Sequence, residues 1–234
     1  MPSRLEGHTF HRFDGELHHL HIEILQMAGL VLNQTQMALE SFQQQNMDIV
    51  RIVKKREHKV DTLEKRIDNA ITEVLAKRVP FACDLRAIIT FSKVVADLER
   101  ISDEAVRIAH IATIIYDNGH NKPSVYMLHD VGVMGKIACV SLKEAIQALD
   151  TLDRNKANKL LNSHDDLDEE FRASLRRLTT YALEDARNVG HTINIVLALK
   201  SLERIGGYAR NLAEYAIYLI SGEDIRHTEN TDQA

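Results

Sequence analysis

The stretch LERISD at residues 98–103 returns as LERIGG at residues 202–207. Alanines follow the two copies at matching positions, so the likeness extends beyond these six residues. A sequence that repeats itself in this way indicates one structural unit built twice. The copies differ in their acidic residues, because the first carries Glu99 and Asp103 whereas the second has Gly207 at the aspartate position.

The composition favours long helices in a globular protein. Of the 234 residues, 44% are hydrophobic and 27% are charged, and there are only three prolines and ten glycines. Breakers are therefore far apart, and no stretch alternates polar and apolar residues with the period of a strand. The formal net charge of −5 argues against nucleic acid as a partner, since phosphate binding requires a positive field.

The sequence predicts a location in the cytoplasm. No stretch approaches the roughly 20 apolar residues that span a bilayer. Residues 1–15 lack the apolar segment of a secretory signal. Cys83 and Cys139 fit neither a disulfide framework nor a CxxC pair, which predicts two reduced thiols.

Helical periodicity between breakers predicts an all-α fold with six helices. They are expected at about residues 13–45, 48–78, 84–116, 124–152, 153–187 and 190–221. Ser124 and Asp153 are the expected N-caps of the fourth and fifth helices. Three long helices with short connections pack as an up-down-up bundle. The repeat therefore predicts two tandem three-helix bundles, at residues 1–119 and 124–222, followed by a polar tail at residues 223–234.

Acidic side chains line the edge of the apolar stripe on two consecutive predicted helices. On a helical wheel, Glu99 and Asp103 border the stripe of the third helix and are separate from its solvated face. The second helix carries an acidic row at the same edge, formed by Glu57, Asp61, Glu64 and Asp68. If these helices pack antiparallel, the two rows face each other across one groove.

Electrostatic repulsion makes such an arrangement costly unless it is compensated. Two carboxylates about 5 Å apart repel by roughly 3 kcal/mol at an effective dielectric constant near 20. Four such groups make six pairs, and their total of about 20 kcal/mol exceeds the net stability of a typical domain. The acids must therefore point into water, pair with lysine or arginine, or hold a cation. We predict a metal site formed by Glu57, Asp61, Glu99 and Asp103.

Carboxylate pairs one helical turn apart suit hard or borderline cations that prefer oxygen ligands. The expected cofactor is a divalent or trivalent ion of magnesium, manganese, iron or zinc, and the sequence does not identify which. The second repeat offers weaker candidates, namely His164, Asp168 and Glu203. Since Gly207 replaces the second aspartate, we expect one competent site, in the first bundle, and a weak or empty one in the second.

No arrangement typical of an enzyme accompanies these rows. The chain has no Ser-His-Asp or Cys-His pairing, no glycine-rich phosphate loop and no CxxC pair that would support catalysis. We therefore predict a protein that is not an enzyme. One alternative from another class stays open, namely a metal-handling or redox helical-bundle protein built on a carboxylate-bridged metal pair.

Several short motifs, in this order and at this spacing, resemble those of the PhoU family. They are HKVD at residues 58–61, DLR at residues 84–86, ERI at residues 99–101 and again at 203–205, and GEDIRH at residues 222–227. The resemblance extends from about residue 13 to residue 227.

The resemblance implies a fold of two three-helix bundles and a homodimer. It also implies metal clusters held by E/DxxxD pairs, which map onto Glu57 with Asp61 and Glu99 with Asp103. The implied function is negative regulation of phosphate uptake and of phosphate-regulon signalling. Such a protein is a cytoplasmic adaptor between the ATPase subunit of the phosphate ABC transporter and a phosphate-sensing histidine kinase. It would reach the membrane only through these protein partners.

Overall fold

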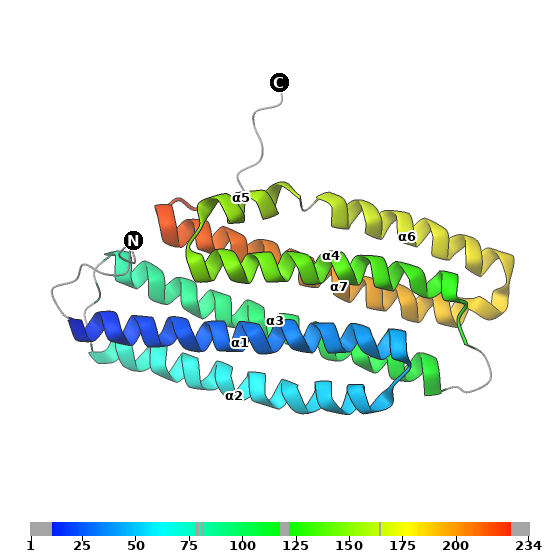
Figure 1. Cartoon of the computed structure of the whole chain (residues 1–234), viewed down its shortest axis with the longest axis horizontal. Helices are drawn as coiled ribbons and strands as arrows, with labels where there is room; N and C mark the ends of the chain where they lie inside the picture. The colour runs from blue at the N-terminus through cyan, green and yellow to red at the C-terminus, as the bar shows by residue number, and fades with distance from the viewer. Residues whose placement is uncertain (1–10, 78–79, 81, 118–121, 164, 226–234) are drawn as a thin grey trace, which may run out of the picture.

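The structure is a computed structural model that describes residues 11–77, 80, 82–117, 122–163 and 165–225. Within these residues the regular structure is helical, and the long helices run side by side along one axis (Figure 1). The elements are α1 (His11–Gln44), α2 (Met47–Lys77), α3 (Ala82–Asp117), α4 (Val125–Thr151), α5 (Arg154–Asn162), α6 (Asp165–Glu184), a 3₁₀ turn η1 (Ala186–Asn188) and α7 (Val189–Ser221).

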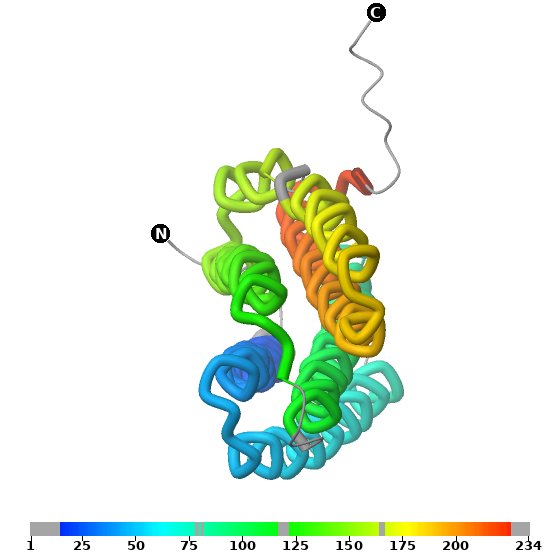
Figure 2. Tube along the Cα trace, turned by 90° about the vertical axis from the view of Figure 1, so that its right-hand side faces the viewer, coloured from blue at the N-terminus to red at the C-terminus, as the bar shows by residue number. Residues whose placement is uncertain are grey.

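The helices form two bundles in tandem, which confirms the predicted fold class. In the first bundle α1, α2 and α3 all pack against one another. In the second bundle α4 and α7 pack together, and α5 and α6 cover them as two pieces of one layer. Viewed end-on, the bundles form two groups that meet where α1 and α3 lie against α4 and α7 (Figure 2).

The repeated motif supplies the centre of each bundle. Leu98 and Ile101 of α3 are completely buried, and so are their counterparts Leu202 and Ile205 of α7. Spacings of three and four residues keep such side chains on one face of a helix. Burying each of them contributes roughly 2 kcal/mol.

Local capping explains where the helices of the second bundle begin. The Ser124 side chain accepts a hydrogen bond from the backbone N–H of Met127, one turn into α4. The Asp153 side chain accepts hydrogen bonds from the N–H groups of Asn155 and Lys156 at the start of α5. Both caps were expected from the sequence, and each satisfies N–H groups that have no partner within the helix.

The expected helix at residues 153–187 is interrupted, which corrects that part of the prediction. It ends at Asn162 and resumes at Asp165. The reason is local, because the Ser163 hydroxyl and the Ser163 N–H both donate to the carbonyl oxygen of Leu160. Such short-range bonds compete with continuation of a helix. The far end is also shorter than expected, because Asp185 accepts from the N–H of Arg187 and starts η1 there.

Polar contacts join the two bundles at the interface of α3 and α7. Asp97 of α3 is only 2% exposed. It accepts hydrogen bonds from Asn211 Nδ2 at 3.0 Å and from the Tyr215 hydroxyl at 3.2 Å, both on α7. Glu104 of α3 accepts from Arg204 of α7 at 2.9 Å. These contacts fix α3 against α7.

Close approach of α1 and α4 depends on a glycine. A Cβ atom at Gly135 of α4 would lie 2.5 Å from Cδ2 of Leu39 on α1, which is closer than carbon atoms pack. The absent side chain therefore lets the two helices approach at the second contact between the bundles.

Among the described residues, α4 is the one helix long and apolar enough to cross a membrane by length and composition. The expectation that no stretch approaches a membrane span is therefore too strict for α4. In the structure, α4 packs against α7 and α1, and side chains such as Met134 and Leu142 are buried. Helix α4 also carries Lys136 and Lys143. The core helix of a bundle can be as long and as apolar as a helix that crosses a membrane.

Candidate metal centre

The acidic rows of α2 and α3 lie within electrostatic reach of each other, as predicted. We call the group formed by Glu57, Asp61 and Glu64 of α2 with Glu99 and Asp103 of α3 the acidic seam. The carboxylates of Asp61 and Asp103 repel each other across the seam, and Asp61 and Glu64 both act on Glu99. The acids of α2 and α3 are therefore electrostatically coupled, and Glu64 takes part in this coupling together with the four residues of the predicted site.

Proton affinities in the acidic seam report this crowding. Partial burial, followed by the nearby carboxylates of Asp103, Glu64 and Asp61, raises the pKa of Glu99 to about 7. Partial burial is also the first cause that raises the pKa values of Glu57, Glu64 and Asp103, and neighbouring carboxylates add to it. A fraction of Glu99 is therefore protonated at neutral pH.

The arginines closest in sequence to the α3 acids point to other partners. Arg100 lies 2.9 Å from Asp97, and Arg107 lies 3.7 Å from Glu104. Both of those acids are buried at the interface between the bundles. The negative charge of the seam is therefore not neutralised by these cations, although Arg100 and Arg107 lower the pKa values of Glu99 and Asp103 in part.

The donor set of the acidic seam fits an oxygen-seeking cation. It consists of carboxylates alone, which suits magnesium, manganese or iron, and His58, 3.9 Å from Asp61, would add a nitrogen donor for zinc. Within the described part of the chain, no three acidic, histidine or cysteine side chains converge closely enough to hold an ion. Side-chain rotation would therefore accompany binding, and metal binding at Glu57, Asp61, Glu99 and Asp103 stays a prediction.

In the second bundle, a lysine lies beside Glu203, the counterpart of Glu99. Lys200 Nζ lies 2.8 Å from Glu203 Oε2 on α7. The same ammonium lies 5.5 Å from the ring centroid of Phe171 on α6. Of the other two predicted candidates, Asp168 is half-buried on α6, and His164 lies outside the described residues.

Among the described residues, the second bundle offers fewer carboxylates at the corresponding positions than the first. No carboxylate stands at Gly207, where a Cβ atom would meet nothing within 4 Å. The other buried acid of this bundle, Asp130 of α4, is held by Arg177 of α6 through Nη2 at 2.8 Å and Nε at 3.0 Å. Cationic side chains therefore hold two acids of this bundle, namely Glu203, which is the counterpart of Glu99, and Asp130.

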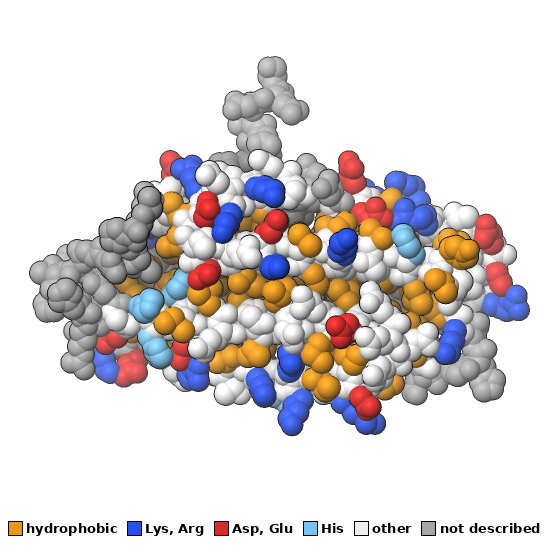
Figure 3. All heavy atoms as spheres, viewed as in Figure 1, with side chains coloured by type: hydrophobic (Ala, Val, Ile, Leu, Met, Phe, Trp, Pro, Cys, Tyr) orange, Lys and Arg blue, Asp and Glu red, His pale blue; other side chains and the backbone are white. Residues whose placement is uncertain are grey.

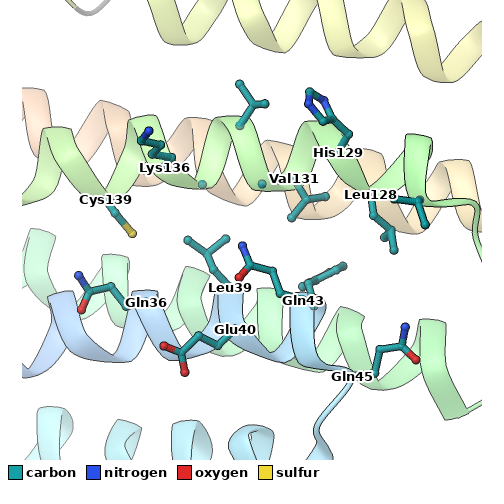
Figure 4. Close-up of a pocket in the computed structure, with 15 residues that line it drawn as sticks. Gln36, Leu39, Glu40, Gln43, Gln45, Leu128, His129, Val131, Lys136 and Cys139 are labelled. Atoms are coloured by element: carbon teal, nitrogen blue, oxygen red, sulfur yellow. The ribbon is translucent and has the colours of Figure 1, made fainter.

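A groove of about 800 Å³ runs between α1 and α4, on the face where hydrophobic side chains form a strip along the middle of the molecule (Figure 3). Leu39, Leu128 and the Cys139 sulfur point into it, whereas the His129 ring points away (Figure 4). Burial raises the pKa of the Cys139 thiol to about 11, so this thiol is not ionised at neutral pH.

Comparison with protein families identifies the repeat. The model of the PhoU domain matches residues 24–112 and, a second time, residues 131–216. The chain belongs to the PhoU family. Each matched segment lies within one of the two bundles, so each bundle contains one match to the PhoU domain.

Proteins named PhoU match nearly the whole chain. The phosphate-specific transport system accessory protein PhoU homologue of Pseudomonas aeruginosa is 36% identical over 223 residues, which cover 95% of this chain and 91% of that protein. The phosphate-specific transport system accessory protein PhoU of Escherichia coli is 29% identical over the same length and share of each chain.

Solved PhoU structures have the same fold. The crystal structure of PhoU from Pseudomonas aeruginosa superposes with a TM-score of 0.86 at 36% sequence identity, and the match covers 90% of this chain and all of the other. The crystal structure of the phosphate transport system regulatory protein PhoU from Streptococcus pneumoniae gives a TM-score of 0.81 at 23% identity, covering 91% and 99% of the two chains.

The structure adds two residues that the sequence analysis did not include in either candidate site, namely Glu64 in the first bundle and Lys200 in the second. Glu64 lies in the predicted acidic row but not in the predicted metal site, although its helical position alongside Asp61 would have justified including it. Lys200 was missed because an isolated lysine on a helix is typical of a solvated surface. Its signal lies in the repeat itself, where Ala96 occupies the matching position.

Proposed function

We propose that this PhoU-family protein is a negative regulator of phosphate uptake and of phosphate-regulon signalling. It acts as a cytoplasmic adaptor between the ATPase subunit of the phosphate ABC transporter and a phosphate-sensing histidine kinase. The observation that carries this proposal is the match of the PhoU domain to both bundles, together with relatives named as accessory proteins of phosphate-specific transport. These relatives are named as accessory proteins and not as enzymes, which supports a regulatory role.

Deleting the gene in its host tests the regulatory role. Alkaline phosphatase, as a reporter of the phosphate regulon, should become constitutively high in ample phosphate, and the intact gene should restore repression. Unchanged phosphatase would overturn the proposal. Binding of the purified protein to the transporter ATPase and to the kinase, measured separately and compared in high and low phosphate, tests the adaptor role.

The metal belongs to this proposal as a structural element of the first bundle. Glu57, Asp61, Glu99 and Asp103 would hold it, with Glu64 beside them. A bound cation would neutralise the carboxylates and tie α2 to α3. What supports this is the raised pKa of Glu99 and the engagement of Arg100 and Arg107 elsewhere.

A pair of variants locates the metal. Glu99→Ala combined with Asp103→Ala should remove most of the manganese retained after dialysis, measured by elemental analysis. Glu203→Ala should remove little, because Glu203 already has an ion-pair partner in Lys200. Equal losses from both variants would contradict a site confined to the first bundle. Size-exclusion chromatography with light scattering of the same samples tests the expected homodimer.

A further inference from the structure

The two PhoU domains of this chain differ at four positions that face the seam between their second and third helices, and apart from His164, which corresponds to Glu57, these residues lie among the described ones. On the third helix of each domain, Ala96 corresponds to Lys200, and Asp103 corresponds to Gly207. On the second helix, aligning Val60 with Leu167 places Phe171 at the position that corresponds to Glu64. Each difference makes the net charge of the second seam less negative than that of the first.

The geometry connects these differences. The Lys200 ammonium lies 2.8 Å from Glu203 and 5.5 Å above the ring of Phe171. It therefore pairs with an acid on α7 while it contacts an aromatic face on α6. A cation over an aromatic ring is attracted by the negative face of the ring. One lysine thus makes the helix-to-helix connection that a metal ion would make between α2 and α3.

The two partners of this contact differ in burial, because the Lys200 side chain is 46% exposed and the Glu203 side chain is less exposed. The Glu203 side chain is 24% exposed, so its charge is partly removed from water. Phe171 packs against the hydrophobic core of the second bundle. At the matching position of the first bundle, the methyl group of Ala96 cannot reach across the seam, and the nearby Arg100 is engaged by Asp97.

We infer that Lys200, held by Glu203 and Phe171, is a built-in cation that takes the place of a metal ion in the second PhoU domain. The second domain of this chain therefore holds α6 against α7 without metal, and metal dependence is confined to the first. The comparison of Lys200 with a metal ion rests on the proposed metal role of the acidic seam. The contacts of Lys200 with Glu203 and Phe171 do not depend on it.

Exchanging the residues between the domains tests this inference with Mn²⁺ as the probe. The triple variant Phe171→Glu, Lys200→Ala and Gly207→Asp gives the second seam the residues of the first at these three positions, with His164 still in place of Glu57. It should bind additional Mn²⁺ relative to the wild type, measured by isothermal titration and by elemental analysis after dialysis. A folded triple variant that binds no additional Mn²⁺ overturns the inference.

The reciprocal change needs only one substitution. Ala96→Lys places an ammonium in the first seam and should abolish most Mn²⁺ binding there, together with the rise in Tm that Mn²⁺ produces. Ala96→Met is the matched control, because it adds a side chain of similar length without charge, and it should retain binding. Unchanged Mn²⁺ binding in Ala96→Lys contradicts the inference even if the triple variant fails to fold.

A metal-free measurement separates failure of this inference from failure of the proposed metal role. In the presence of EDTA, Lys200→Met and Glu203→Gln should each lower Tm, and the double variant should lower it no further than either single change. Additive losses would refute the Lys200–Glu203 contact. A wild type that binds no Mn²⁺ would instead refute the metal role of the first domain, and the EDTA experiment would still decide the role of Lys200.

Discussion

Single residue differences between the repeats determine whether a cationic side chain lies beside the acids of each bundle. The first seam carries five carboxylates, and no arginine adjacent to them in α3 is directed into it. The second seam keeps Glu203 but supplies Lys200 beside it. Because the apolar core positions of the two repeats agree, the fold tolerates either solution.

Glu99 should make the stability of the metal-free protein depend on pH. Its pKa in the folded state, about 7, lies above the ordinary value of 4.5. The folded state therefore holds the proton more tightly than the unfolded state, and this stabilisation is complete below about pH 4.5 and is lost as the pH rises toward 7. In EDTA, Tm should fall over that range. Glu99→Gln should flatten the fall and raise Tm above pH 7, as measured by calorimetry.

Added Mn²⁺ provides the control for this experiment. It should raise the Tm of the wild type most strongly above pH 7, where the carboxylates are ionised, and should raise that of Glu99→Gln much less. Identical pH profiles for the wild type and Glu99→Gln in EDTA would show that the pKa of Glu99 is not raised by partial burial and the neighbouring carboxylates in the folded state.

At the level of whole helices, periodicity predicts the long uninterrupted elements and misses short-range competition. The ends of α1 to α4 lie within a few residues of their expected positions, because prolines, glycines and capping residues mark them. The gap between α5 and α6 was missed, because Asn162 and Ser163 lie inside a pattern that still repeats every three to four residues. Only the bonds from Ser163 to the Leu160 carbonyl show that the helix ends there.

For the candidate site too, the sequence predicts which face of a helix a residue occupies but not its side-chain contacts. The helical wheel predicts that Glu57, Asp61, Glu99 and Asp103 approach one another, since it fixes the face of each residue. It does not predict where a long side chain finds its partner. Lys200 and Arg204 are both charged residues of α7, yet one contacts Glu203 in its own bundle and the other reaches Glu104 in the first.

The nine-residue α5 should depend strongly on its cap. A helix this short is marginal alone, and it is stabilised by Asp153 at its N-terminus and by the burial of Ala157 and Leu160. Asp153→Ala should lower the free energy of unfolding by about 1 kcal/mol, measured by urea denaturation. Asp153→Ser retains a capping oxygen and should lose less. An equal loss in both variants would mean that the cap is not the cause.

At the scale of the whole molecule, α3 connects the acidic seam to the second bundle. Asp103 lies in the seam, and the next residue, Glu104, accepts a hydrogen bond from Arg204 of α7. One turn earlier, Glu99 lies in the seam while Asp97 binds Asn211 and Tyr215 of α7. A change at the seam and a change at the interface between bundles therefore act on the same helix.

The contacts of Asp97 should make the two bundles unfold together. Its buried carboxylate accepts hydrogen bonds from Arg100 on its own helix and from Asn211 and Tyr215 across the interface. Asp97→Ala should cost about 2 kcal/mol, because donors to a buried charge lose their acceptor. Asp97→Asn keeps one acceptor oxygen and should cost about half as much. Urea denaturation gives these values.

Hydrogen exchange shows how far that loss extends. Because α3 and α7 share the Asp97 contacts, exchange should quicken in both helices of Asp97→Ala, and by similar factors. Faster exchange in α3 alone would mean that the carboxylate stabilises only its own bundle. In that case the Asp97 contacts would not couple the two bundles, whereas the contact of Glu104 with Arg204 would still join α3 to α7.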